Sequence, residues 1–298
     1  MNTNIELAKP RDFGEIINDT FIFVRQNFKP LLKYFFIFCG FFLLAAAATS
    51  ILMQINMVRA INNFNPNSFD NTNPFSRFAV FTPAYFLNIL FLLLEYLSIM
   101  IMVLCFMALY KQKQNQVPTT EEMWGYFKFY FLRILGSSFV VTILLIVGFV
   151  FCFIPGIYLY PIMALVFPII IMENASFNYA FNYSFKLIKD NWWGTFGVLL
   201  VMGIVLSVAS SILVLPSVLL TMGSLFFHIT KGTTVSLAAL IITSLLKEIS
   251  HIFQVLSVVT TCLCYFNLSE SKEGTGLMER INQFGNNNTD SNTTPEEY

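Results

Sequence analysis

Hydrophobic residues along this chain gather into long runs with little or no charge, rather than into short alternating stretches. A helix that crosses about 30 Å of hydrocarbon needs roughly 20 apolar residues. Six runs of suitable composition occur, at 34–54, 84–109, 135–154, 157–172, 194–215 and 246–267. The pattern therefore predicts an all-α, polytopic membrane protein with six transmembrane helices.

The third and fourth runs are separated only by the segment 153–156, Phe-Ile-Pro-Gly. Pro155 cannot continue a helical hydrogen-bond ladder, and Gly156 accepts the backbone angles of a turn. We therefore expect a tight hairpin here, followed by a short fourth span. Pro161 and Pro168 predict kinks within that span.

Amphipathic segments precede three of the six runs. Apolar residues before the first run form one helical stripe: Phe13, Ile16, Ile17, Phe21, Val24 and Phe28. The same spacing returns 164 positions later: Phe177, Ala180, Phe181, Phe185, Ile188 and Trp192. A weaker copy at an offset of 108 pairs Trp124, Phe129, Leu132 and Arg133 with Ile16, Phe21, Val24 and Arg25.

These repeats predict interfacial helices at about 12–29, 121–133 and 176–192, so that the fold consists of three units of one amphipathic helix plus two spans. Such helices are expected to lie along the inner leaflet, with membrane lipids as partners. The alternative is that they pack against the ends of the helix bundle, because an apolar stripe serves either partner equally well.

Composition supports a membrane location. Hydrophobic residues make up 56% of the 298 residues and charged residues 11%, against about 45–50% and about 25% in soluble proteins. The formal net charge is +0, so no basic surface indicates a nucleic-acid partner.

The distribution of positive charge predicts the orientation. Thirteen of the 17 Lys and Arg residues lie on one side of the predicted topology, and cytoplasmic loops carry this excess. We therefore expect both termini in the cytoplasm and a multi-pass location in a bacterial cytoplasmic (inner) membrane. Residues 1–274 form the predicted membrane domain, 55–83 an irregular outer connector, and 275–298 a disordered tail.

Ionisable residues inside the runs are the candidate functional groups, since each costs about 2.5–3.5 kcal/mol at the membrane centre. Glu95 is the firmest, because no other charge lies between Phe78 and Tyr110. In the last run a polar stripe consists of Ser244, Lys247, His251 and Gln254, with Glu248 beside it. Lys247 and Glu248 alternatively mark the outer boundary of that helix.

The depth of Glu95 predicts its partner. Glu95 lies 15 residues from Tyr110, and His251 lies 16 residues from Asn267. At about 1.5 Å per residue the two side chains are level. We therefore expect Glu95 to pair with His251 or Lys247.

The stretch from Pro155 to Phe196 carries a family resemblance. Its relevant positions are Pro155, Gly156, Glu173, Asn174, Ser184, Asn191, Trp192 and Trp193. This pattern resembles the membrane domain that precedes the catalytic domain in some bacterial glycerophosphoryl diester phosphodiesterases, and related stand-alone bacterial membrane proteins. The resemblance implies a membrane module without the hydrolase. Asn174 or Ser176 is placed to cap the following helix.

Catalytic motifs are not found in the sequence. There is no Gly-rich phosphate loop, no Cys/His metal spacing and no Ser/His/Asp set. Histidine is limited to His228 and His251. The cysteines lie in apolar runs and indicate neither a disulfide nor a metal centre: Cys39, Cys105, Cys152, Cys262 and Cys264. We therefore expect no cofactor and no enzymatic activity.

Two functions remain open. The favoured one is a non-enzymatic membrane module, acting as a scaffold, assembly factor or lipid-interacting protein. The alternative is a transporter or channel for a small solute or lipid, using Glu95 and the polar stripe of the last span. Transporters place several polar groups from different helices inside the membrane, so the number of helices that contribute such groups separates the two.

Overall fold

The computed structural model describes residues 5–62, 83–151, 153–231 and 237–274. Within these ranges every regular element is helical, and six helical segments are long and apolar enough to cross a membrane. The predicted all-α, six-span fold is confirmed. Most of the predicted outer connector and the whole tail at 275–298 lie outside the described residues.

Five of the six candidate spans contain the corresponding predicted run and extend beyond it, whereas the third ends at Phe151, before the predicted limit of 154. The candidate spans are Phe28–Asn56, Pro83–Gln112, Thr120–Phe151, Phe153–Met172, Trp192–Leu220 and Ile241–Glu273. The helices are α1 (Phe13–Gln26), α2 (Phe28–Tyr34), α3 (Gly40–Asn62), α4 (Pro83–Gln112), α5 (Thr120–Phe151), α6 (Phe153–Met172), α7 (Phe177–Ile188), α8 (Trp192–Lys231), α9 (Leu237–Ser250) and α10 (Gln254–Glu273).

Two spans change helix type within their length. A π-helical segment, η1 (Phe35–Cys39), joins α2 to α3, and a 3₁₀ turn, η3 (His251–Phe253), joins α9 to α10. Such changes of winding re-aim the side chains that follow and often occur at functional positions. The first and last spans are therefore discontinuous α-helices.

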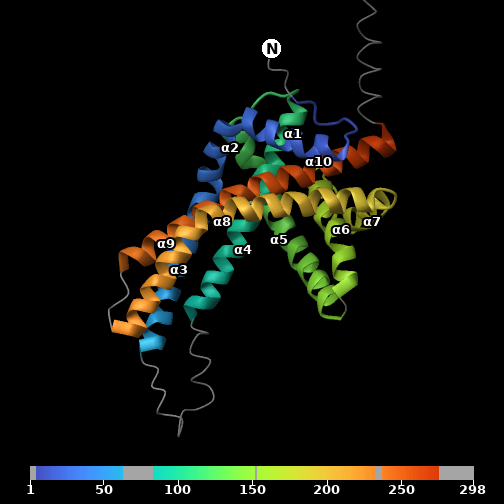
Figure 1. Cartoon of the computed structure of the whole chain (residues 1–298). Helices are drawn as coiled ribbons and strands as arrows, with labels where there is room; N and C mark the ends of the chain where they lie inside the picture. The colour runs from blue at the N-terminus through green and yellow to red at the C-terminus, as the bar shows by residue number, and fades with distance from the viewer. Residues whose placement is uncertain (1–4, 63–82, 152, 232–236, 275–298) are drawn as a thin grey trace, which may run out of the picture.

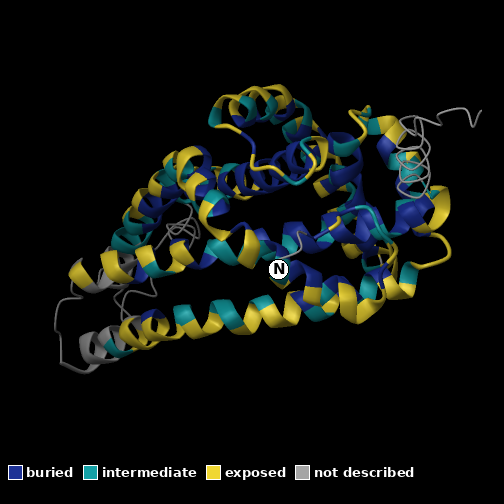
Figure 2. Cartoon of the chain, turned by 90° about the horizontal axis from the view of Figure 1, so that it is seen from above, coloured by how far each residue is buried: buried dark blue, intermediate teal, exposed yellow. Residues whose placement is uncertain are grey.

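The helices diverge from a shared centre (Figure 1). Helices α1 and α2 lie at one end of the molecule, here called the α1 end. Toward the opposite end, α3, α4 and α9 form one arm, and the α5–α6 hairpin forms another. Helix α4 is the most enclosed, because every residue from Leu97 to Tyr110 is buried. Figure 2 shows buried positions gathered toward the middle and exposed ones along the outer helices.

Large apolar side chains cover the outer faces of α5 and α8. Leu132 and Val150 on α5 are exposed, as are Ile212 and Leu219 on α8. In water such surfaces would be unfavourable, but lipid tails are as apolar as these side chains. The exposed faces therefore account for the high hydrophobic content of the chain.

The turn between α5 and α6 lies earlier than predicted. Helix α5 ends at Phe151 and α6 begins at Phe153, so Pro155 and Gly156 are already helical. Proline is tolerated there because the first turn of a helix leaves its N–H groups unpaired. A Cβ on Gly156 would lie 2.5 Å from the Phe149 ring, so glycine allows α5 and α6 to approach closely.

Helices α1 and α7 occupy the two stronger amphipathic segments, but the buried face of α1 was predicted only in part. Its buried residues include Ile16, Thr20 and Phe23, whereas the predicted stripe residues Phe13 and Phe21 are 46% and 42% exposed. The predicted stripe had lipid or the helix bundle as its partner, because aromatic periodicity does not separate a protein-facing from a lipid-facing side, and Phe13 and Phe21 lie on the side that protein does not cover.

The repeat is nevertheless visible in burial. At the offset of 164, the buried α1 residues Ile16, Thr20 and Phe23 correspond to Ala180, Ser184 and Leu187, which are buried in α7. The two helices therefore share a pattern of protein-facing positions.

The third predicted interfacial helix is not separate. Residues 121–133 form the first part of α5, which continues to Phe151 because no proline interrupts it. Its buried residues Met123, Phe127 and Tyr130 correspond to the buried α1 positions at an offset of 107, not 108. The weaker copy was therefore displaced by one residue, which put the exposed Trp124 on the apolar stripe.

Candidate functional site: an intramembrane carboxylate–histidine cluster

Glu95 lies inside α4, two residues before its fully buried section, and is 1% exposed. Glu248 lies near the end of α9 and is 0% exposed. Ionised carboxylates are almost never enclosed in this way without a positive partner. The negative charge of the two glutamates therefore has to be neutralised by a nearby group.

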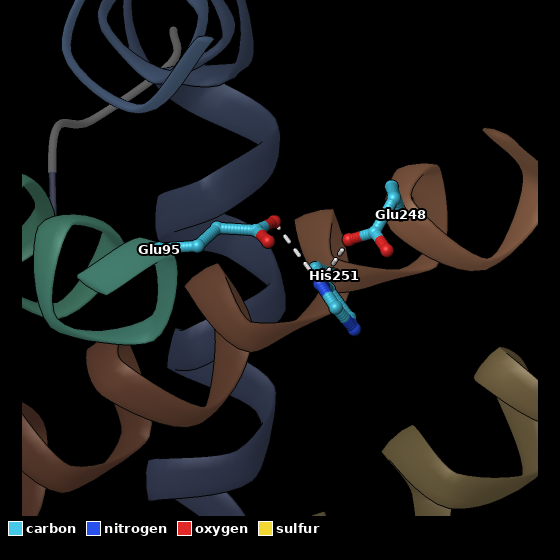
Figure 3. Close-up of side chains that lie close together, drawn as sticks. All are labelled: Glu95, Glu248 and His251. Carbon is cyan, nitrogen blue, oxygen red and sulfur yellow. Dashed lines mark hydrogen bonds and ion pairs between the residues drawn. The ribbon is translucent and has the colours of Figure 1, made fainter. Parts of the chain in front are cut away.

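His251 lies between the two carboxylates (Figure 3). Its Nδ1 is 3.0 Å from Oε1 of Glu95 and 3.3 Å from Oε2 of Glu248. Glu95 comes from α4, Glu248 from α9, and His251 from the 3₁₀ turn η3. The break in the last span therefore occurs at the residue that joins the two acidic groups.

Hydrogen bonding within this cluster is incomplete. Nδ1 can carry one hydrogen, and it forms a hydrogen bond with Oε1 of Glu95. Oε2 of Glu95 and both carboxylate oxygens of Glu248 have no hydrogen-bond partner within the described part of the chain. The cluster is therefore rich in acceptors and poor in donors.

The predicted contact between Glu95 and His251 is confirmed. The alternative partner, Lys247, is exposed and forms no ion pair among the described residues, and Glu248 occupies the inward position instead. Both residues have helical spacings that place them near His251, so periodicity did not choose between them. Helix α9 packs against α3, and Glu248 lies on the buried side of α9.

Polar side chains continue from the cluster toward the opposite end. Nε2 of Gln54 on α3 donates to Oγ of Ser244 on α9 at 2.7 Å. Nδ2 of Asn88 on α4 donates to Oγ1 of Thr49 on α3 at 3.1 Å. Ser244 was predicted as part of the polar stripe. The other three were missed, although an isolated Gln or Asn in an apolar run is a signal.

A shorter polar connection lies toward the α1 end. The hydroxyl oxygens of Thr20 on α1 and Thr260 on α10 are 3.2 Å apart, and both residues are fully buried. Gln254, at the start of α10, has a buried Oε1 without a hydrogen-bond partner in the described residues. Polar groups therefore occur on both sides of the cluster.

A second group of charged residues lies at the α1 end. Nε of Arg11 donates to Oδ2 of Asp19 at 2.8 Å, and Nζ of Lys9 lies 3.1 Å from the same oxygen. Burial by itself raises the pKa of Asp19, but the hydrogen bonds from Arg11 and Lys9 outweigh it and hold that pKa below its usual range. Arg11 also donates to the backbone carbonyls of Glu6, Leu7 and Lys9. These contacts fix the segment before α1.

The family-motif residues Glu173 and Asn174 lie at the junction of α6 and α7. The hydroxyl of Tyr265 donates to Oε1 of Glu173 at 2.8 Å, and burial raises the pKa of Glu173. Asn174 has a left-handed backbone, with φ of 49°, and accepts a hydrogen bond from Arg133. Ser176 is the residue that caps α7.

Of the other motif residues, Ser184 lies in α7, and Asn191, Trp192 and Trp193 lie where α8 begins. Nε1 of Trp192 donates to the carbonyl oxygen of Tyr158 at 3.1 Å, and the two rings stack. Ser184 is buried in α7, while the carbonyl of Asn191 accepts from Thr195 at the start of α8. Trp193 is exposed. These contacts belong to helix packing and do not involve Glu95 or Glu248.

The predicted absence of disulfides agrees with the described residues, in which Cys39, Cys105, Cys262 and Cys264 are free and buried. Cys152 and the side chain of His228 lie outside the description.

An apolar cavity of about 550 Å³ lies on another face of α4. It is lined by residues of α4, α5, α6 and α10, among them Leu97, Leu135, Met163 and Val258. Its lining does not include Glu95, Glu248 or His251. The charged cluster and this cavity are therefore separate features of the helix bundle.

No family model, curated protein or solved structure matches this chain. The fold and the cluster define an integral membrane protein that encloses two glutamates and a histidine among its helices.

Proposed function

We propose that the protein is a non-enzymatic membrane transporter that moves a small cationic solute through the cluster of Glu95, Glu248 and His251. The observation that supports this most directly is the enclosure of two carboxylates whose oxygens are only partly hydrogen-bonded. Carboxylates inside a bundle mark ion or substrate pathways in membrane proteins. A purely structural bundle would gain more from apolar side chains of the same volume.

The helices that contribute polar groups support the same choice. The first span supplies Thr49 and Gln54, the second Asn88 and Glu95, and the last Ser244, Glu248 and His251. Discontinuous spans around a central site are characteristic of transporters, and both the first and the last span change winding in this protein. A scaffold would not require polar side chains from three different spans to converge.

The proposal is tested by flux measurements on the full chain in proteoliposomes. Gradients of Na⁺, K⁺, Mn²⁺ and Zn²⁺ are imposed in turn, and uptake is followed with ion-specific dyes. The wild-type protein should carry at least one of these ions faster than empty vesicles. Glu95→Gln keeps the shape and a hydrogen-bonding group, so it should fold normally while uptake falls at least tenfold.

Glu121→Gln is the matched control, because Glu121 is exposed at the start of α5. This variant should transport at the wild-type rate. Equal permeability of wild-type, Glu95→Gln and empty vesicles to all four ions would overturn the proposal.

A second candidate is a lipid-interacting module, as the resemblance to phosphodiesterase membrane domains suggests. It is favoured by the exposed aromatic residues Phe13, Phe21 and Phe28 at the α1 end, which suit the headgroup boundary of an inner membrane with both termini in the cytoplasm. Quenching by brominated lipids tests it: a Trp placed at Phe21 should be quenched, and one placed at the buried Ile16 should not.

A further inference from the structure

The cluster of Glu95, Glu248 and His251 has the composition of a metal-binding site. Each residue offers one ligand atom, and the three atoms lie within 4.8 Å of one another. Two are carboxylate oxygens and the third is an imidazole nitrogen. The residues come from two spans, so the cluster is held from two sides.

The unpartnered atoms point to a cation rather than to another polar ligand. The buried side-chain atoms without a hydrogen-bond partner in the described chain belong to Glu95, Glu248 and Gln254, and all of them are oxygens. When the carboxyl groups are ionised, these oxygens accept and cannot donate, so an anion or a carbonyl would leave them unsatisfied. A positive ion would satisfy several of them together.

The charge balance favours a divalent ion. In the forms that bind metals, with both carboxylates ionised and the imidazole neutral, the cluster carries two negative charges. A divalent cation brings the enclosed group to zero net charge, whereas a monovalent ion leaves one charge uncompensated, at a high cost in low dielectric. His251 then acts as a neutral nitrogen ligand, the form in which histidine binds metals.

We propose that Glu95, Glu248 and His251 bind one divalent transition-metal ion, of which Zn²⁺ is the best-suited example. Mixed carboxylate and imidazole ligands suit Zn²⁺, while Mg²⁺ and Ca²⁺ prefer sites built of oxygen alone. Three protein ligands leave a fourth position for water or an incoming ligand, as in exchangeable rather than closed structural sites. This inference deepens the proposed function by naming its substrate class, but binding itself does not depend on transport.

Metal binding is measured on the full chain, purified in detergent and freed of metal. Competition with a fluorescent chelator should give one Zn²⁺ per chain for the wild-type protein. His251→Gln and Glu248→Gln should each weaken binding at least tenfold, because each removes one ligand. Glu121→Gln and Lys247→Gln are the matched controls and should bind as the wild type does. Ca²⁺ at equal concentration should not compete.

X-ray absorption on the wild-type protein keeps the test decisive if a variant fails to fold. The bound Zn²⁺ should show only nitrogen and oxygen neighbours, at about 2.0–2.2 Å, with the signature of one imidazole. A sulfur neighbour at about 2.3 Å would instead assign the metal to a cysteine and overturn the proposal. Absence of stoichiometric Zn²⁺ and Mn²⁺ binding to the folded wild-type protein would overturn it as well.

The two proposals fail separately. Uptake of Na⁺ or K⁺ that depends on Glu95, without Zn²⁺ or Mn²⁺ binding, would discard the metal site and retain a cation transporter. One bound Zn²⁺ that is lost in His251→Gln, without uptake of any of the four ions, would retain the metal site and discard transport.

Discussion

The backbone N–H of Arg11 donates to Oδ1 of Asn267 at 2.7 Å, although 256 residues separate them in the sequence. Arg11 belongs to the segment before α1, and Asn267 lies in the last span. This bond joins the two ends of the described chain at the α1 end. The same arginine is tied to Asp19, so one residue connects α1 to α10.

Asn267→Ala should therefore destabilise the protein. The change leaves the partly buried N–H of Arg11 without its acceptor, which costs about 1–3 kcal/mol. Thermal unfolding in detergent, followed by circular dichroism, measures the effect. Asn182→Ala is the control, because Asn182 is exposed and bonds only within α7. An equal loss in both variants would contradict a special role for the contact at Arg11.

Acid should weaken the α1 end through Asp19. Its pKa in the folded protein lies below the ordinary value of 3.8. Its ionised form therefore contributes stability that is present above pH 3.8 and is lost as pH falls through the folded value. We expect the melting temperature to drop between pH 5 and pH 2, and less so in Asp19→Asn. An identical acid profile for that variant and the wild type would exclude Asp19 as the cause.

The buried face of α1 can be tested by truncating neighbouring aromatic residues. Phe23 is 0% exposed and packs edge-to-face with the rings of Phe106 and Tyr110. Phe23→Ala should cost about 3–5 kcal/mol, because it opens a cavity in the core. Phe21→Ala, on the exposed side, should cost about 1 kcal/mol or less. The reverse order in unfolding free energies would place Phe21, and not Phe23, on the protein-facing side.

The buried and exposed faces of α1 are a part of the fold that the sequence does not predict. Long apolar runs with few or no charges were enough to locate six spans, because hydrocarbon imposes length and apolarity on each of them. The level of Glu95 with His251 followed from the constant rise of a helix. The side of α1 that meets protein did not follow, since lipid and protein offer equally apolar partners.

The environment of His251 was predictable only in part for a related reason. Lys247 and Glu248 lie four and three residues before it, and both spacings put a side chain on its face. Which of them turns inward depends on the 3₁₀ turn and on packing against α3, and neither is encoded in local periodicity. Arg11 lies outside the periodic segment that contains Asp19, so periodicity gave no signal for the contact between them.

The contact between Glu95 and His251 can be measured by a double-mutant cycle on the metal-free protein. Glu95→Ala and His251→Ala each remove one partner of a buried hydrogen bond and should each cost about 1–3 kcal/mol. The double variant loses the pair only once, so its cost should be smaller than the sum by about 1–3 kcal/mol. Unfolding free energies from denaturant titration in mixed micelles give the four corners of the cycle.

The matched cycle combines Glu95→Ala with Lys247→Ala. Lys247 is exposed and forms no ion pair among the described residues, so these two changes should add to within about 0.5 kcal/mol. The comparison is informative because Lys247 lies one helical turn from His251 and was the alternative partner predicted for Glu95. If Lys247 couples to Glu95 and His251 does not, the last span is rotated relative to α4, and the cluster of two carboxylates and a histidine does not exist.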